Sequence, residues 1–127
     1  MQLRFEQVPW MSSPPLVPDH SVIDLEHLRR MTTGDAALER EVLQMFKTQS
    51  ADLLARLETM PADMPALAHT LKGSSRAIGA VDVSNAAQAL EASLHAGSGV
   101  AAAIGGLVSA VDEANAAIEE ILNGRRC

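Results

Sequence analysis

The chain has 127 residues, which suits a single domain with its own hydrophobic core. Hydrophobic residues make up 47% of the sequence but aromatic residues only 2%, with no tyrosine, so the composition favours helices over sheets. The formal net charge of -6 excludes strong non-specific attraction to nucleic acid or to anionic membrane, because both would repel the chain.

Cysteine content and hydropathy indicate the compartment. Cys127 is the only cysteine, so no intrachain disulfide can form. No stretch approaches the roughly 20 apolar residues that span a bilayer. The start of the chain, MQLRFEQVPWMSSPP, lacks the uninterrupted apolar run of a signal peptide. We therefore expect a cytoplasmic protein that binds neither membrane nor nucleic acid.

Proline separates the chain into two parts. Residues 1–20 contain Pro9, Pro14, Pro15 and Pro18, which remove backbone donors and force their neighbours into extended geometry. We expect these residues to form a proline-rich arm and residues 21–127 to form one helical domain.

Helical periodicity begins after the arm. Asp24 is a suitable N-cap for a short helix that ends before Gly34, and Asp35 can cap the next helix. This second helix, the longest amphipathic segment, runs until Pro61. Its expected apolar stripe consists of Leu38, Val42, Met45, Phe46, Leu53 and Leu57.

Three further helices follow, joined by connections of a few residues. Asp63 opens a third helix from Met64 to about Ile78, which Gly79 ends. The fourth runs from about Val81 to Leu94, and the fifth covers roughly Val100 to Leu122. The fold class is therefore all-α, an antiparallel up-and-down four-helix bundle with an additional short N-terminal helix. We expect the methionine-rich faces to fill its core.

The third helix has two predicted faces. At about 100° per residue, the inner side carries Leu67, Leu71, Ser74 and Ile78. His69 projects roughly opposite this side, toward solvent, and Lys72, Gly73 and Arg76 share its face at positions i+3, i+4 and i+7.

Gly73 is unexpected inside a helix, where glycine costs about 1 kcal/mol relative to alanine. A side chain at this position would crowd the His69 ring, whereas glycine leaves a bare patch for another protein surface. Lys72 and Arg76 make that patch attractive to an anion although the whole chain is acidic. A neutral imidazole is a nucleophile, and a nearby ammonium group offsets the charge of a transferring group, so the pattern indicates phosphoryl transfer.

The segment AHTLKGSSRAIGA resembles the signature of histidine-containing phosphotransfer (HPt) domains. The family's spacing is met at His69, Lys72, Gly73, Ser74, Ser75 and Gly79. The similarity extends to Leu90 and Glu91 and covers roughly residues 20–122.

The resemblance implies roles for these residues. His69 would be phosphorylated on a ring nitrogen, Lys72 would assist the phosphoryl group, and Gly73 would leave room for the partner's active site. Glu91 falls where many family members place a polar residue near the histidine, often glutamine. A carboxylate there would repel a phosphohistidine unless it turns away or contacts Lys72.

Other residues are assigned by position. We expect Ala66, Thr70, Gly73 and Ala77 to surround His69 in a docking surface. Arg76 either favours the phosphoryl group or is an ordinary solvated arginine, and Ser74 and Ser75 either pack or donate a hydrogen bond to the histidine or phosphate. Surface or helix-end roles are expected for His20, His27 and His95. The histidines and the cysteine lack zinc-site spacing, so no metal site is expected.

The resulting hypothesis is a monomeric phosphocarrier, not an ATP-dependent kinase, that relays a phosphoryl group between receiver-domain aspartates of a hybrid sensor kinase and a response regulator. It would hold no cofactor, and the receiver domain would supply Mg²⁺. One alternative is the dimeric phosphoacceptor bundle of a histidine kinase, which typically has an acidic residue and a proline where this chain has Thr70 and Gly73. Another is a helical adaptor that binds a receiver or other protein without phosphate.

Overall fold

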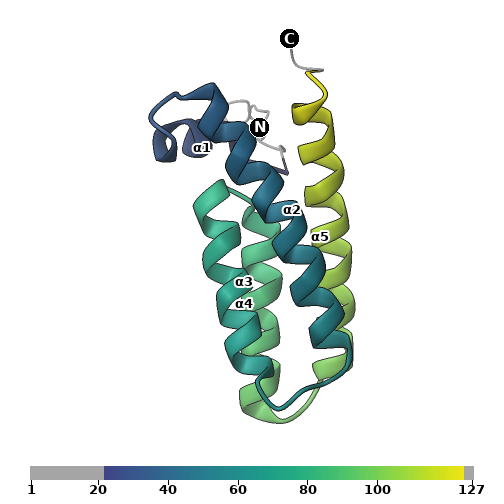
Figure 1. The fold of residues 1–127 in the computed structure, drawn as a ribbon. Coiled ribbons are helices and arrows are strands. Elements are labelled where there is room, and N and C mark those ends of the chain that lie inside the picture. Colours follow the sequence, from purple (N-terminus) through teal and green to yellow (C-terminus); the bar gives the residue numbers. More distant parts are fainter. Residues whose placement is uncertain (1–21, 125–127) are drawn as a thin grey trace, which may run out of the picture.

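A computed structural model describes residues 22–124, and within this range every regular element is a helix, as expected for an all-α chain (Figure 1). The expected arm, residues 1–20, lies outside the described part. The helices are α1 (Leu25–Met31), α2 (Ala36–Glu58), α3 (Met64–Ile78), α4 (Val81–Ala96) and α5 (Val100–Leu122). The five helices agree with the expected ones to within a few residues, and α4 extends two residues beyond its expected end at Leu94.

The four long helices surround one core. α3 packs mainly on α4, α4 on α5, and α2 on both α3 and α5, so the contacts close a ring of four helices (Figure 1). The core consists almost entirely of aliphatic side chains and alanines, with Phe46 as its aromatic member. Burying one leucine of this kind stabilises the fold by about 1.5–3 kcal/mol, and alanines let neighbouring helices approach closely.

The predicted apolar stripe of α2 is partly wrong. Leu38 and Met45 are exposed, at 38% and 62% of their surface, whereas Leu43 is fully buried. The buried face of α2 consists of Leu43, Phe46, Ser50, Leu53 and Leu57. These residues repeat at spacings of three and four, and they face the gap between α3 and α5.

The expected role of methionine as core filling is confirmed only for Met64, which is 6% exposed. Met31, Met45 and Met60 are 56%, 62% and 55% exposed, so they lie on the surface of the described part of the chain. Leucine, valine and alanine fill the core in their place.

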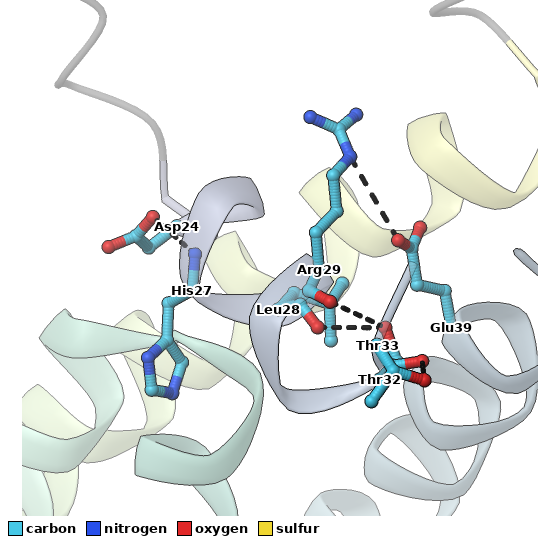
Figure 2. A network of polar contacts seen from close by, with 7 residues as sticks. All are labelled: Asp24, His27, Leu28, Arg29, Thr32, Thr33 and Glu39. Atoms are coloured by element: carbon cyan, nitrogen blue, oxygen red, sulfur yellow. Dashed lines mark hydrogen bonds and ion pairs between the residues drawn. The ribbon is translucent and has the colours of Figure 1, made fainter. Parts of the chain in front are cut away.

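A backbone hydrogen bond joins the start of α1 to the end of α3. The Asp24 side chain caps α1 by accepting a hydrogen bond of 3.1 Å from the His27 backbone N–H, as Figure 2 shows. The Asp24 N–H in turn donates to the Gly79 carbonyl over 2.9 Å. On the other side, Arg29 Nε lies 3.9 Å from Glu39 Oε2 of α2 (Figure 2). α1 is thus held at one end of the bundle, where Figure 1 also places it.

Helix α5 corrects one expectation. Over residues 22–124 it is the one helix whose length and composition suffice to cross a bilayer, although no such stretch was expected. About a quarter of that window, 28%, is buried inside the protein, and core helices of globular proteins meet the same criterion. The side chains that α5 contributes to the core are Leu107, Val111, Ala114 and Ile118.

Candidate functional site

Helix α3 presents one buried and one open face, and His69 lies on the open one. Pro65 occupies the first turn, where the missing N–H costs nothing, and Gly79 ends the helix in the left-handed region at φ 80°. The buried residues of α3 are Met64, Leu67, Ala68, Leu71, Ser75 and Ile78. Ser75, not Ser74, therefore lies on the inner face, and its hydroxyl donates to the Lys72 carbonyl over 3.0 Å.

Gly73 leaves an open patch on the helix, as expected, but a Cβ there would not reach the His69 ring, so the expected crowding of the ring by a side chain does not begin at the first carbon. A Cβ built on Gly73 would meet no atom within 4 Å, apart from its chain neighbours and the backbone of its own helix. The His69 side chain, one turn earlier, is 73% exposed. Access to the imidazole from outside is therefore unobstructed by the described residues.

Glu91 of α4 contacts two predicted site residues of α3. Its Oε2 lies 3.1 Å from His69 Nδ1, and its Oε1 lies 2.6 Å from Lys72 Nζ. The Lys72 side chain is 17% exposed and that of Glu91 25%, so the ion pair is largely covered while the imidazole is not. The contact between Glu91 and Lys72, which the sequence left as one of two alternatives, is the one observed.

The electrostatics of this group keep Glu91 ionised. The hydrogen bond from the Lys72 ammonium holds the pKa of the Glu91 carboxyl below its ordinary value, against the opposing effect of burial, and the hydrogen bond with His69 adds to the lowering. An ionised carboxylate can only accept hydrogen bonds. His69 Nδ1 must therefore be the donor, which leaves the lone pair of a neutral ring on Nε2.

The remaining predicted site residues lie on α3, and within residues 22–124 none of them forms a hydrogen bond or ion pair with the His69 ring. Ala66, Thr70 and Ala77 are exposed, and Ser74 is half-buried. Arg76 is exposed and has no ion-pair partner among residues 22–124, but it lies two turns from His69, about 10 Å along the helix axis. The structure therefore gathers His69, Lys72 and Glu91 and leaves Arg76 apart.

The other histidines are separate from this group. His27 is half-buried in α1, His95 is exposed in the last turn of α4, and His20 lies outside the described residues. Within residues 22–124 no cluster of three or more histidine, cysteine, aspartate or glutamate side chains could hold a metal ion.

The site is convex. Two surface hollows occur elsewhere, one lined by α2 alone and one by α2 together with the end of α5, and His69 lines neither. A nucleophile that stands on an open helix face cannot exclude water by itself. Its reaction partner must therefore bring its own enclosing cleft, which suits a protein better than a small molecule.

Sequence reasoning named Glu91 but left its role open, and a signal for it existed. α3 and α4 are joined only by Gly79 and Ala80, so they form a helical hairpin. His69 and Glu91 lie at nearly equal distances along the chain from this turn. Residues at matching distances from a tight turn come to the same level of the two helices, which predicts their contact.

Comparison with known proteins finds a matching family model. The Hpt domain family model matches residues 41–124, which include α3, α4 and α5 and most of α2. Searches of curated proteins and of solved structures found no significant match. Hpt domains carry out histidine phosphotransfer in two-component systems, the chemistry that the exposed His69 suggests. The resemblance seen in the sequence is thereby confirmed, and the chain belongs to the Hpt domain family.

Proposed function

We propose that this protein is a phosphorelay intermediate in which His69 accepts a phosphoryl group from the receiver-domain aspartate of a hybrid sensor kinase and passes it to the aspartate of a response regulator. The observation that carries the proposal is an imidazole that is 73% exposed and held at Nδ1 by Glu91, next to a glycine with open space around it. The chain acts as a phosphocarrier without kinase activity of its own.

Lys72 and Gly73 have distinct roles in this proposal. The Lys72 ammonium, now bound to Glu91 over 2.6 Å, is one turn from His69 and can share its hydrogen bonds with a phosphoryl oxygen. Gly73 lets the receiver approach the ring. The receiver domain brings the Mg²⁺ and the enclosing cleft, and this chain brings the nucleophile.

The docking surface is proposed around His69. Ala66, Thr70, Gly73 and Ala77 are exposed on the same side of α3, and three of the four are alanine or glycine. Small side chains give a flat surface that suits weak, reversible binding. Arg76 and Ser74 border this surface, where Arg76 can contact an acidic partner.

The order of the helices, the compartment and the oligomeric state are also proposed. Short connections between successive helices support an antiparallel up-and-down order for the four long helices, with α1 as an additional element. We propose that the protein acts as a cytoplasmic monomer, because each chain carries the complete His69, Lys72 and Glu91 group.

The decisive experiment follows radiolabel from a phosphorylated receiver domain, with Mg²⁺ present, to the native chain, to His69→Gln and to His95→Gln. His95 is the matched control because it is also an exposed helical histidine. We expect acid-labile, base-stable label on the native and His95→Gln chains and none on His69→Gln. Binding to a receiver without any label on the native chain would overturn the proposal and favour an adaptor.

A further inference from the structure

The outer side of α2 carries a row of apolar side chains that the other described helices do not cover. Leu38, Val42 and Met45 follow one another at i, i+4 and i+7, so they share one side of the helix. Leu38 is 38% exposed and Met45 62%, and Val42 between them is half-buried. The other large exposed hydrophobic residues of the described chain lie on different elements. Single exposed apolar residues are ordinary, whereas a contiguous group of them indicates a contact surface.

A surface hollow adjoins this row on the same helix. The residues that line it are Glu41, Gln44, Met45, Thr48, Gln49 and Asp52. Asp52 lies 3.5 Å from Arg56, and Glu41 forms no ion pair within residues 22–124. No lysine or arginine of the described chain lines the hollow. The hollow together with Leu38 and Val42, called the α2 groove below, therefore suits an apolar segment that carries a positive charge.

The proline-rich arm, residues 1–20, has the composition of such a segment. The chain has two phenylalanines, one tryptophan and no tyrosine, and both Phe5 and Trp10 belong to the arm. Arg4 is the one lysine or arginine of residues 1–20. An aromatic side chain buries about 150–250 Å² when it is covered, and the thioether of methionine makes favourable contacts with aromatic rings. The arm thus carries most of the chain's aromatic residues, and α2 offers an exposed methionine.

We infer that the arm docks on the α2 groove of its own chain, with Trp10 against Met45 and Arg4 beside the carboxylates of the groove. The inference goes beyond the proposed function and does not rest on it. It assigns an occupant to the exposed side of α2, and it leaves the open face of α3, with His69, free for a partner.

The length of the chain outside the described part permits this contact. Trp10 precedes Val22, the first described residue, by 12 positions. In polyproline geometry these span up to about 37 Å, at 3.1 Å per residue. Met45 lies only about 14 Å along the helix axis from Ala36, the first residue of α2. The arm also begins close to that end of α2, because α1 is short and its Arg29 lies 3.9 Å from Glu39.

The covalent connection makes a weak contact sufficient. A tethered segment has an effective concentration on the order of mM at a site that it can reach. A contact between Trp10 and Met45 that would be too weak to join two separate chains can therefore keep the arm docked on its own bundle.

The surface around His69 fits the arm less well than the α2 groove. Its exposed residues, Ala66, Thr70, Gly73 and Ala77, are small, and none of the large exposed hydrophobic residues lies on α3. An indole ring placed there would find no large apolar side chain to pack against. The difference favours α2 as the site of docking.

The first test uses the fluorescence of Trp10, the chain's only tryptophan, in the full chain. We expect emission at shorter wavelength than that of free tryptophan, with weaker quenching by acrylamide. Met45→Gln should lower the ratio of docked to free arm by about tenfold, which moves the emission toward that of free tryptophan. Met60→Gln is the matched control, because Met60 is 55% exposed but lies outside the groove, and it should behave as native.

Two outcomes of this test would overturn the inference. One is emission like that of free tryptophan in the native chain, and the other is an equal response to Met45→Gln and Met60→Gln. The native emission should also stay constant on dilution. A shift to longer wavelength on dilution would show that the arm docks on a second copy of the chain, which contradicts docking within one chain.

The second test locates the indole ring by NMR of the methionine methyl groups, whose resonances shift when an aromatic ring lies against them. We expect Trp10→Leu to move the Met45 methyl resonance and to leave that of Met60 unchanged. The substitution lies outside the helical core, so the bundle should remain folded. Movement of the His69 ring resonances with an unchanged Met45 methyl would place the arm over the histidine and refute the inference.

Discussion

Gly73 inside α3 and Gly79, which ends that helix, both belong to the motif, yet they have opposite roles in the structure. Around Gly73 a Cβ would meet nothing within 4 Å, so the residue keeps a surface open. At Gly79 a Cβ would lie 2.8 Å from the Asp24 carbonyl oxygen, and φ is 80°. Gly73 therefore leaves open surface near His69, whereas Gly79 allows α1 to pack against the end of α3. A sequence signature can thus combine a requirement of the site with a requirement of the fold.

Gly79→Ala should have the largest effect on stability. Alanine would be strained at this φ and would push against the Asp24 backbone, so we expect the free energy of unfolding to fall by about 3 kcal/mol. Gly97→Ala is the matched control, because Gly97 also ends a helix at positive φ but has nothing within 4 Å of a Cβ. It should cost about 1 kcal/mol. Equal losses in urea denaturation would show that the contact with Asp24 contributes nothing.

Gly73→Ala should stabilise the fold, in contrast to Gly79→Ala. The position is helical and open, so alanine should raise the free energy of unfolding by up to about 1 kcal/mol. Phosphoryl transfer should nevertheless slow by about tenfold, since a methyl group next to His69 would obstruct docking. Gly105→Ala, an equally open helical position in α5, should give the same stabilisation with an unchanged transfer rate. Faster transfer in Gly73→Ala would contradict the role of Gly73 in access.

The smallest predicted effect is on the free energy of unfolding at acidic pH. Because Lys72 lowers the pKa of Glu91 in the folded chain, the ionised form favours folding. This contribution is complete above the pKa of an unfolded glutamate, about 4.3, and is lost as the pH falls through the lower folded value. The difference in unfolding free energy between native and Glu91→Gln should therefore shrink below about pH 4. A difference that grows in acid would contradict the assignment, and Lys72→Met should abolish the effect.

The order and the ends of the helices could be predicted because local residues determine them. Asp24 and Asp35 cap α1 and α2 through hydrogen bonds of 3.1 Å to backbone N–H groups, as their sequence positions suggest. Gly79 ends α3 by adopting positive φ. That His69, Lys72 and Gly73 share one helix face could also be predicted, since residues three and four apart lie together, although the Lys72 side chain is largely covered.

It was harder to predict which face of each helix is buried, because burial depends on neighbours that are distant in sequence. α2 carries apolar residues on more than half of its circumference, and contacts with α3 and α5 decide that Leu43 is buried and Met45 exposed. A shift of one residue, about 100°, also separates the expected Ser74 from the observed Ser75 on the buried side of α3. The pairing of Glu91 with His69 depends on the register between α3 and α4, which helical periodicity alone does not contain.

The two-residue connection between α3 and α4 has a consequence for how the site assembles during folding. His69 and Glu91 are 22 residues apart in sequence, and the segment between them is the remainder of one helical hairpin. Closing such a short segment costs little chain entropy, and contacts of low sequence separation form rapidly. His69 and Glu91 therefore belong to one local unit, and we expect their contact to form before α2 pairs with α5.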